Sequence, residues 1–100
     1  MVTLYPVDVG DVRATAITVE LPKTSLLAVT TDRGYIMCGA LDVHLLNTRL
    51  AERGIVAGRA LGVRTIEQLL DAPLAEVTDA ARALGILPGM SGREAIQRMK

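Results

Sequence analysis

The sequence predicts an α+β fold, with a mostly antiparallel sheet of about five strands built from a meander and one strand–helix–strand crossover, and with C-terminal helices packed on it. Three observations predict this fold. Apolar stretches of strand length fill the first third of the chain, short turn segments separate them, and helical spacing with capping residues fills the last third. The 100 residues contain no linker or low-complexity segment, so residues 1–100 are expected to form a single domain.

The first third of the chain is expected to form the meander. Met1–Val9 has a strand-like composition and contains Pro6, which lacks a backbone N–H and therefore favours an edge strand. Gly10 and Asp11 follow it with residues typical of a tight turn. Three more strands are predicted over Arg13–Leu21, Ser25–Thr31 and Tyr35–Cys38. The short turns between them indicate antiparallel neighbours.

The crossover is expected to begin directly after the fourth strand. Asp42 is placed to cap a helix, because its carboxylate can accept hydrogen bonds from free backbone N–H groups. Apolar residues then recur on one helical face at Val43, Leu46 and Leu50. Gly54 is a typical helix stop, and Ile55–Val63 is predicted as the fifth strand. Such a unit crosses over right-handed onto the same sheet.

The last third of the chain is expected to be helical. Thr65 with Gln68 forms a capping box ahead of an apolar pair. A second helix is indicated by an apolar stripe at Val77, Ala80, Ala81 and Leu84. Gly85 would end this helix. Ser91 with Glu94 forms another capping box and opens the final helix.

The composition bounds the function. Eleven basic and eleven acidic residues cancel, and only two residues are aromatic, which argues against a nucleic-acid binder. The zero net charge and 50% hydrophobic content favour a homo-oligomer, because little repulsion opposes association. The single cysteine, the lack of a signal-peptide pattern and the lack of a membrane-length apolar run predict a cytoplasmic protein that does not bind membranes.

The stretch GYIMCGALDVHLLN holds the one cysteine and the one histidine. Cys38 is a candidate nucleophile, with His44 and Asp42 as its catalytic partners, because a helix start or a nearby imidazolium lowers a thiol pKa. The competing interpretation is a buried cysteine at a strand end, followed by a helix cap. A metal site is not predicted, because one cysteine and one histidine supply too few of the ligands that zinc needs. No cofactor is indicated.

Two further motifs are candidates for binding a small anion. In GMSGREA, Ser91, Gly92 and Arg93 could offer a hydroxyl, a close backbone approach and a guanidinium, although the capping box already explains the serine and Glu94 would repel an anion. In GRALGVR, Arg59 and Arg64 should lie on opposite faces of a strand.

The face of this predicted strand that carries Gly58, Ala60 and Gly62 has almost no side-chain volume, so another group must approach it closely. A packed helix is the first expectation. A ligand or a partner subunit is the alternative.

Three long motifs, YIMCGALDVHLLN, ERGIVAGRALGVRTIEQLLDAPL and LGILPGMSGREAI, resemble the YunC-like family of small bacterial and archaeal proteins. The resemblance spans essentially the whole chain, although the first twenty residues are less distinctive. It implies an α+β fold of about this length and a stand-alone protein. It assigns no catalytic or binding residue, because the family is one of unknown function.

The residues themselves predict a small binding or interaction module that forms a homo-oligomer and holds a small anionic ligand. A small enzyme using Cys38, His44 and Asp42 is the alternative from a different class. An accessory subunit of a larger complex is the third hypothesis. Burial of Cys38 discriminates the first two, because a nucleophile needs access to solvent or to a cleft.

Overall fold

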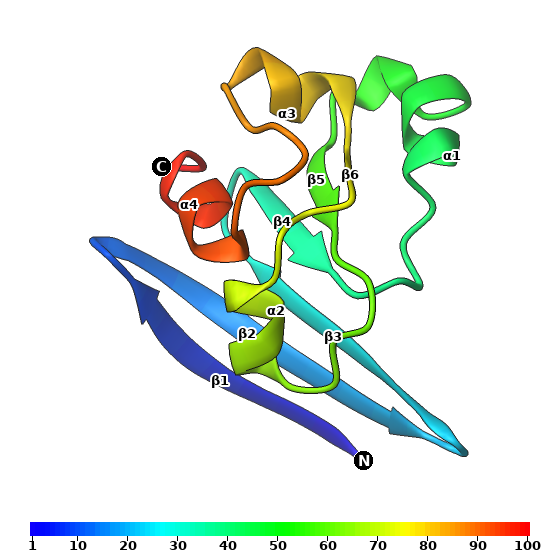
Figure 1. Cartoon of the computed structure of the whole chain (residues 1–100), viewed down its shortest axis with the longest axis vertical. Helices are drawn as coiled ribbons and strands as arrows, with labels where there is room; N and C mark the ends of the chain where they lie inside the picture. The colour runs from blue at the N-terminus through cyan, green and yellow to red at the C-terminus, as the bar shows by residue number, and fades with distance from the viewer.

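The computed structural model describes all 100 residues, Met1–Lys100, and has the predicted α+β architecture, with one sheet and short helices packed on it (Figure 1). The strands are β1 (Val2–Val9), β2 (Val12–Leu21), β3 (Thr24–Thr30), β4 (Gly34–Met37), β5 (Val56–Arg59) and β6 (Glu76–Val77). The helices are α1 (Val43–Thr48), the 3-10 turn η1 (Ala51–Arg53), α2 (Ile66–Asp71), α3 (Asp79–Ala83) and α4 (Gly92–Gln97).

The six strands lie in the sheet in the order in which they occur along the chain. All neighbouring strands are antiparallel except β4 and β5, which are parallel and joined by α1 and η1. The predicted meander and the single crossover are therefore confirmed. Strand β1 forms one edge of the sheet, as Pro6 predicted.

The crossover helix starts where predicted and ends earlier. Asp42 Oδ1 accepts a hydrogen bond from the Leu45 N–H at 3.0 Å, which confirms Asp42 as the N-cap. The α-helix stops at Thr48, and the chain continues through η1 to Gly54, whose φ of +58° is the left-handed conformation expected of a glycine stop. Two short helical pieces therefore replace the one helix predicted up to Gly54.

The prediction of a fifth strand over Ile55–Val63 was too long. Strand β5 covers Val56–Arg59 only, and Gly62 has a φ of +71°, which no extended strand adopts. A sixth strand was missed, because β6 has only two residues and pairs with a strand from another part of the chain. Val77 belongs to β6, and Thr78, whose Oγ1 accepts from the Ala81 N–H, caps α3 instead.

The other helix signals are confirmed. Thr65 Oγ1 accepts from the Gln68 N–H at 3.1 Å, and Ser91 Oγ accepts from the Glu94 N–H at 3.2 Å. The Gln68 side chain reaches back one residue further than a capping box requires, to the N–H of Arg64.

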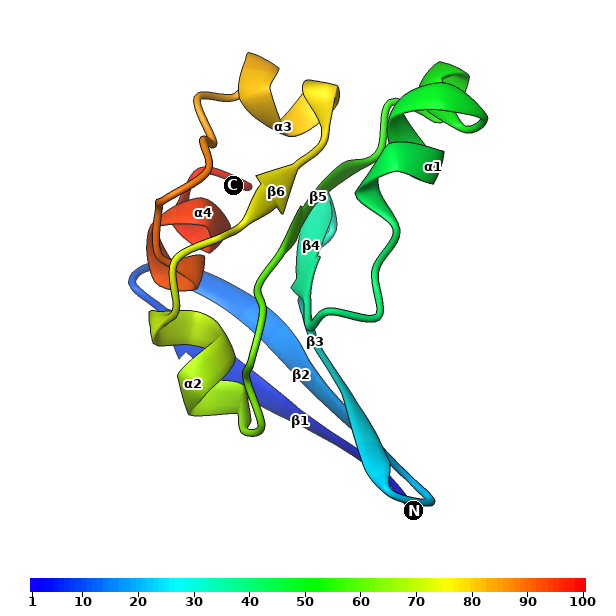
Figure 2. The ribbon, with the colours of Figure 1, turned by 45° about the vertical axis from the view of Figure 1, so that its right-hand side comes forward.

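Helices α2 and α4 pack on one side of the sheet, and α1 lies on the other side, near β5 (Figure 2). The core between the sheet and α2 and α4 is aliphatic, as the absence of Phe and Trp predicted. Its strand residues alternate along β2 at Val12, Ala14 and Ala16, and β3 adds Leu27 and Val29. Because α1 is confined to the region of β5, the other face of β1, β2 and β3 has no helix on it. The helices are at most six residues long, so none of them is long enough to cross a membrane.

Candidate functional site

Cys38 lies in the core directly after β4. Its side chain is 7% exposed and belongs to the main hydrophobic cluster. Its Sγ is 3.5 Å from the Leu27 backbone nitrogen, which donates a weak hydrogen bond to it. This position agrees with the interpretation of Cys38 as a structural residue at a strand end, because a nucleophilic thiol needs an accessible surface.

The structure does not connect Cys38 to the other two candidates of the enzyme hypothesis. Asp42 and His44 are both exposed, and the Asp42 carboxylate is used by the cap of α1. No hydrogen bond links any two of the three side chains. His44 lines a shallow groove of about 250 Å³ between α1, β6 and α3, and Cys38 is not part of that groove. No cluster of three or more metal-ligating side chains exists anywhere in the chain.

The candidate anion site at the start of α4 is already occupied by contacts within the chain. The Gly92 N–H donates to the Ala72 carbonyl at 3.3 Å, and the Glu94 N–H donates to Ser91. The guanidinium of Arg93 pairs with Asp71 at 2.7 Å. An anion at this place would have to displace these partners.

Arg59 and Arg64 lie in different surroundings from Arg93 and from each other. Arg59 is half-buried, pairs with Glu76 on β6 and donates to the Gly39 carbonyl at 3.1 Å. Arg64 is exposed and its guanidinium has no partner within the chain. The three arginines therefore do not converge on one anion.

The close approach expected at Gly58 is made by the chain itself. A Cβ at this position would lie 2.8 Å from Leu74 Cδ1, so the Leu74 side chain fills the space over β5. Leu74 follows α2 rather than belonging to a helix, so the expected packed helix is replaced by a loop residue. Gly62, in contrast, has nothing within 4 Å of where its Cβ would be.

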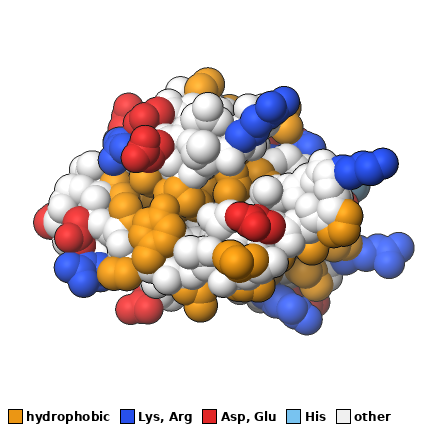
Figure 3. All heavy atoms as spheres, turned by 90° about the horizontal axis from the view of Figure 1, so that it is seen from below, with side chains coloured by type: hydrophobic (Ala, Val, Ile, Leu, Met, Phe, Trp, Pro, Cys, Tyr) orange, Lys and Arg blue, Asp and Glu red, His pale blue; other side chains and the backbone are white.

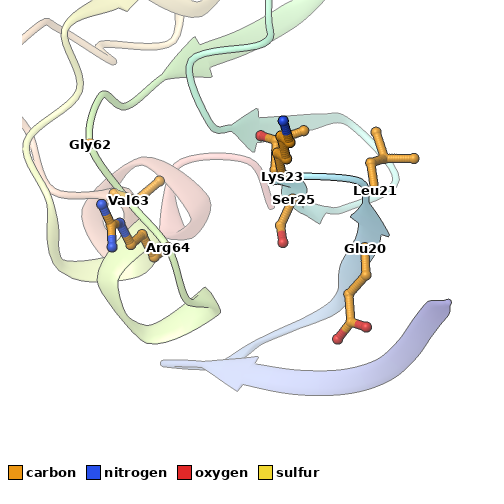
Figure 4. A pocket seen from close by; sticks show the side chains of 8 residues that line it. Glu20, Leu21, Lys23, Ser25, Gly62, Val63 and Arg64 are labelled. Carbon is orange, nitrogen blue, oxygen red and sulfur yellow. The ribbon is translucent and has the colours of Figure 1, made fainter.

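Arg64 does line a pocket of about 770 Å³ between the β2–β3 turn and the loop that leads from β5 to α2 (Figure 4). The pocket residues are Glu20, Leu21, Lys23, Thr24, Ser25, Gly62, Val63 and Arg64. Figure 4 shows Lys23 and Ser25 on one side of the pocket and Val63 and Arg64 on the other. Lys23 and Ser25 could not be identified from the sequence, because only the fold brings the β2–β3 turn and the β5–α2 loop together.

A second feature is the face of β1, β2 and β3 that the helices leave uncovered. The strand register places two apolar rows across it, Val2–Val19–Leu26 and Leu4–Ile17–Ala28. Val2 and Leu4 are 63% and 62% exposed, and of the six residues only the small Ala28 is buried. Figure 3, which views the molecule from the side where β1 lies lowest in Figure 1, shows hydrophobic side chains gathered on that side. We call these six residues the open apolar face.

Polar groups border the open apolar face at one end. The next row along the strands is Pro6–Thr15–Thr30, and beyond it Arg13 pairs with Asp8. The hydrogen bond with the Asp8 carboxylate raises the pKa of Arg13 above its ordinary value. An apolar centre with a polar rim is the typical anatomy of a protein–protein interface.

Comparison with known proteins agrees with the fold and leaves the activity open. A family model described as a domain of unknown function (DUF1805) matches residues 37–99. The uncharacterized protein YunC of Bacillus subtilis (strain 168) is 66% identical over 99 residues, which are 99% of this chain and 98% of that protein. The crystal structure of a protein of unknown function, TA1206 from Thermoplasma acidophilum, has a TM-score of 0.89 at 28% sequence identity, over 100% of this chain and 94% of that one.

Proposed function

We propose that this chain, which belongs to the DUF1805 family together with the uncharacterized protein YunC, is a small interaction module. It associates with copies of itself through the open apolar face. The observation that carries this proposal is the pair of uncharged apolar rows, crossing three strands, on a sheet face without a helix. An antiparallel sheet can leave one face in water when the side chains on that face are polar. The side chains of the open apolar face are not polar.

A second copy of the chain suits this face better than a charged partner. None of the six side chains carries a charge, so two copies can bring their rows together without removing a charge from water. The chain has a net charge of zero, so no long-range repulsion opposes the encounter. A two-fold axis would bring the same face of both copies into contact, which is the commonest symmetry of homo-oligomers.

The contact should be face to face rather than edge to edge. Met1 and Glu20 exchange both backbone hydrogen bonds across β1 and β2. The hydrogen-bonded pairs alternate along an antiparallel ladder, so the register directs the backbone groups of Leu4 and Pro6 toward the free edge. Pro6 has no N–H to offer there, which interrupts any ladder with another strand. Two sheets stacked on their apolar faces need no such ladder.

The test measures the oligomeric state of wild type and of Leu4→Lys by sedimentation velocity over the micromolar range. Leu4 is exposed in the single chain, so lysine there should leave the fold intact while placing a charge in the apolar contact. We expect an oligomer for wild type and a monomer for Leu4→Lys. Leu87→Lys is the matched control, because Leu87 is 49% exposed and lies outside the open apolar face.

Two results would contradict the proposal. The first is a wild-type protein that stays monomeric throughout this concentration range. The second is a Leu4→Lys variant that remains as oligomeric as wild type, which would place the contact on another surface. Circular dichroism of both variants separates loss of association from loss of folding.

A further inference from the structure

The pocket between the β2–β3 turn and the β5–α2 loop contains charged side chains that the fold itself does not use. Lys23 and Arg64 line it from opposite segments, and the side chain of neither residue forms an ion pair or a hydrogen bond within the chain. We propose that this pocket binds a small anionic metabolite that carries a phosphate or carboxylate group, with Lys23 and Arg64 as the two exposed cations that attract it. The pocket lies within one chain, so its occupancy does not depend on the association proposed above.

The conformation of Lys23 supports a role beyond the turn itself. Lys23 has a φ of +63° and is the only non-glycine residue in the chain with a positive φ. It follows Pro22 in the two-residue turn between β2 and β3, where the third position of a type II turn calls for glycine or asparagine. A side chain in this conformation is strained, and such strain is concentrated at functional sites. Lys23 keeps this conformation in a turn that lines the pocket.

The pocket also offers uncharged donors. The hydroxyls of Thr24 and Ser25 make no hydrogen bond within the chain, and the N–H groups of Gly62 and Val63 have no backbone or side-chain acceptor. Gly62 has open space where a Cβ would stand, so a ligand can approach its backbone closely. Hydroxyl and amide donors beside two cations are the groups that hold phosphate and carboxylate oxygens.

Glu20 lowers the net positive charge of the pocket. Its carboxylate opposes an anion, and Figure 4 shows it turned away from Lys23. Two cations and one carboxylate leave a single positive charge, which favours a ligand with one anionic group. The volume of about 770 Å³ is within the range of small-molecule pockets, so the anionic group should belong to a larger molecule than free phosphate.

The test uses inorganic phosphate as the probe, added at constant ionic strength and followed by the backbone amide signals of the labelled protein. We expect saturable shifts at Ser25, Gly62 and Val63. Lys23→Gln and Arg64→Gln should each weaken the fitted affinity about two- to fivefold, as the loss of one exposed charge pair does. Glu20→Gln should strengthen it by a similar factor.

Two controls make the test decisive. Arg49→Gln removes an exposed arginine that lies on the other side of the sheet and outside the pocket, so phosphate affinity should not change. Lys23→Gly should raise the melting temperature of the free protein, because it relieves the strained conformation, and should still lose phosphate affinity. Shifts that do not saturate, or equal affinities in wild type, Lys23→Gln and Arg49→Gln, would overturn the proposal.

Discussion

Cys38 is the residue whose accessibility decides between an enzyme and a non-catalytic module. It is 7% exposed, sits in the core cluster and accepts only a weak hydrogen bond from Leu27. A thiol must reach the reagent to react, so we expect slow labelling of the folded protein and fast labelling after denaturation. A disulfide reagent with absorbance detection measures both rates. Stoichiometric labelling of the folded protein as fast as that of a free thiol would instead support the hypothesis of catalysis by Cys38 with His44.

Single residues with local partners could be predicted from sequence, and those with distant partners could not. Asp42, Thr65 and Ser91 cap helices because their side chains bond to an N–H three residues later. Thr78 has the same kind of local partner, the Ala81 N–H, and this cap was missed because the predicted apolar stripe begins at Val77. Its further hydrogen bonds to Ala57 and Ile55, more than twenty residues earlier in the chain, could not be predicted from local sequence.

At the scale of elements, the contact between α4 and α2 depends on the absence of a side chain at Gly92. A Cβ there would lie 2.5 Å from the Leu69 carbonyl oxygen and 2.7 Å from Ile36 Cδ1. The carbonyl belongs to the backbone of α2 and cannot move away without shifting that helix. Gly92→Ala should therefore lower the free energy of unfolding by about 2 kcal/mol or more, although alanine favours helix formation.

Gly54→Ala is the matched control for this substitution. Gly54 has a φ of +58° and nothing within 4 Å of its missing Cβ, so alanine there adds backbone strain without a clash, about 1 kcal/mol. Urea unfolding of both variants against wild type measures the difference. A Gly92→Ala protein as stable as wild type would show that α4 does not pack on α2 as described.

The boundaries of the elements show where sequence patterns lose their predictive power. The meander was predictable because alternation and turns are local features. Strand β6 has two residues, too few for any periodic pattern. It forms because its residues pair with the free edge of β5. The interval Ile55–Val63 contains apolar residues throughout, yet Gly62 turns the chain toward α2 after only four strand residues.

At the scale of the whole molecule, the two proposed sites arise from segments that the sequence keeps apart. The open apolar face combines three strands in register, and the anion pocket combines residues 20–25 with residues 62–64. Apolar stretches separated by turn residues predicted the strands themselves. They could not show that the helices would cover one side of β1, β2 and β3 and leave the other open, because that depends on how the last third of the chain packs.

The same long-range packing determines what the smallest folding unit is. The DUF1805 family model matches residues 37–99, which begin at the end of β4. Seven of the nineteen residues in the core cluster precede this segment: Val9, Val12, Ala14, Ala16, Leu27, Val29 and Ile36. They form the surface on which α2 and α4 rest. A fragment covering residues 37–100 would expose the apolar sides of these helices to water and lose most of β4, the parallel neighbour of β5.

We therefore predict that the fragment 37–100 does not fold alone, because its short helices gain their stability from packing rather than from length. Amide signals with little dispersion and a non-cooperative urea transition are the expected results. Deletion of Met1–Thr3 is the matched control: these residues are exposed and contribute nothing to the core cluster, so that chain should unfold cooperatively. If the fragment 37–100 shows dispersed signals and a cooperative transition, the domain is the matched segment itself and the meander is an addition to it.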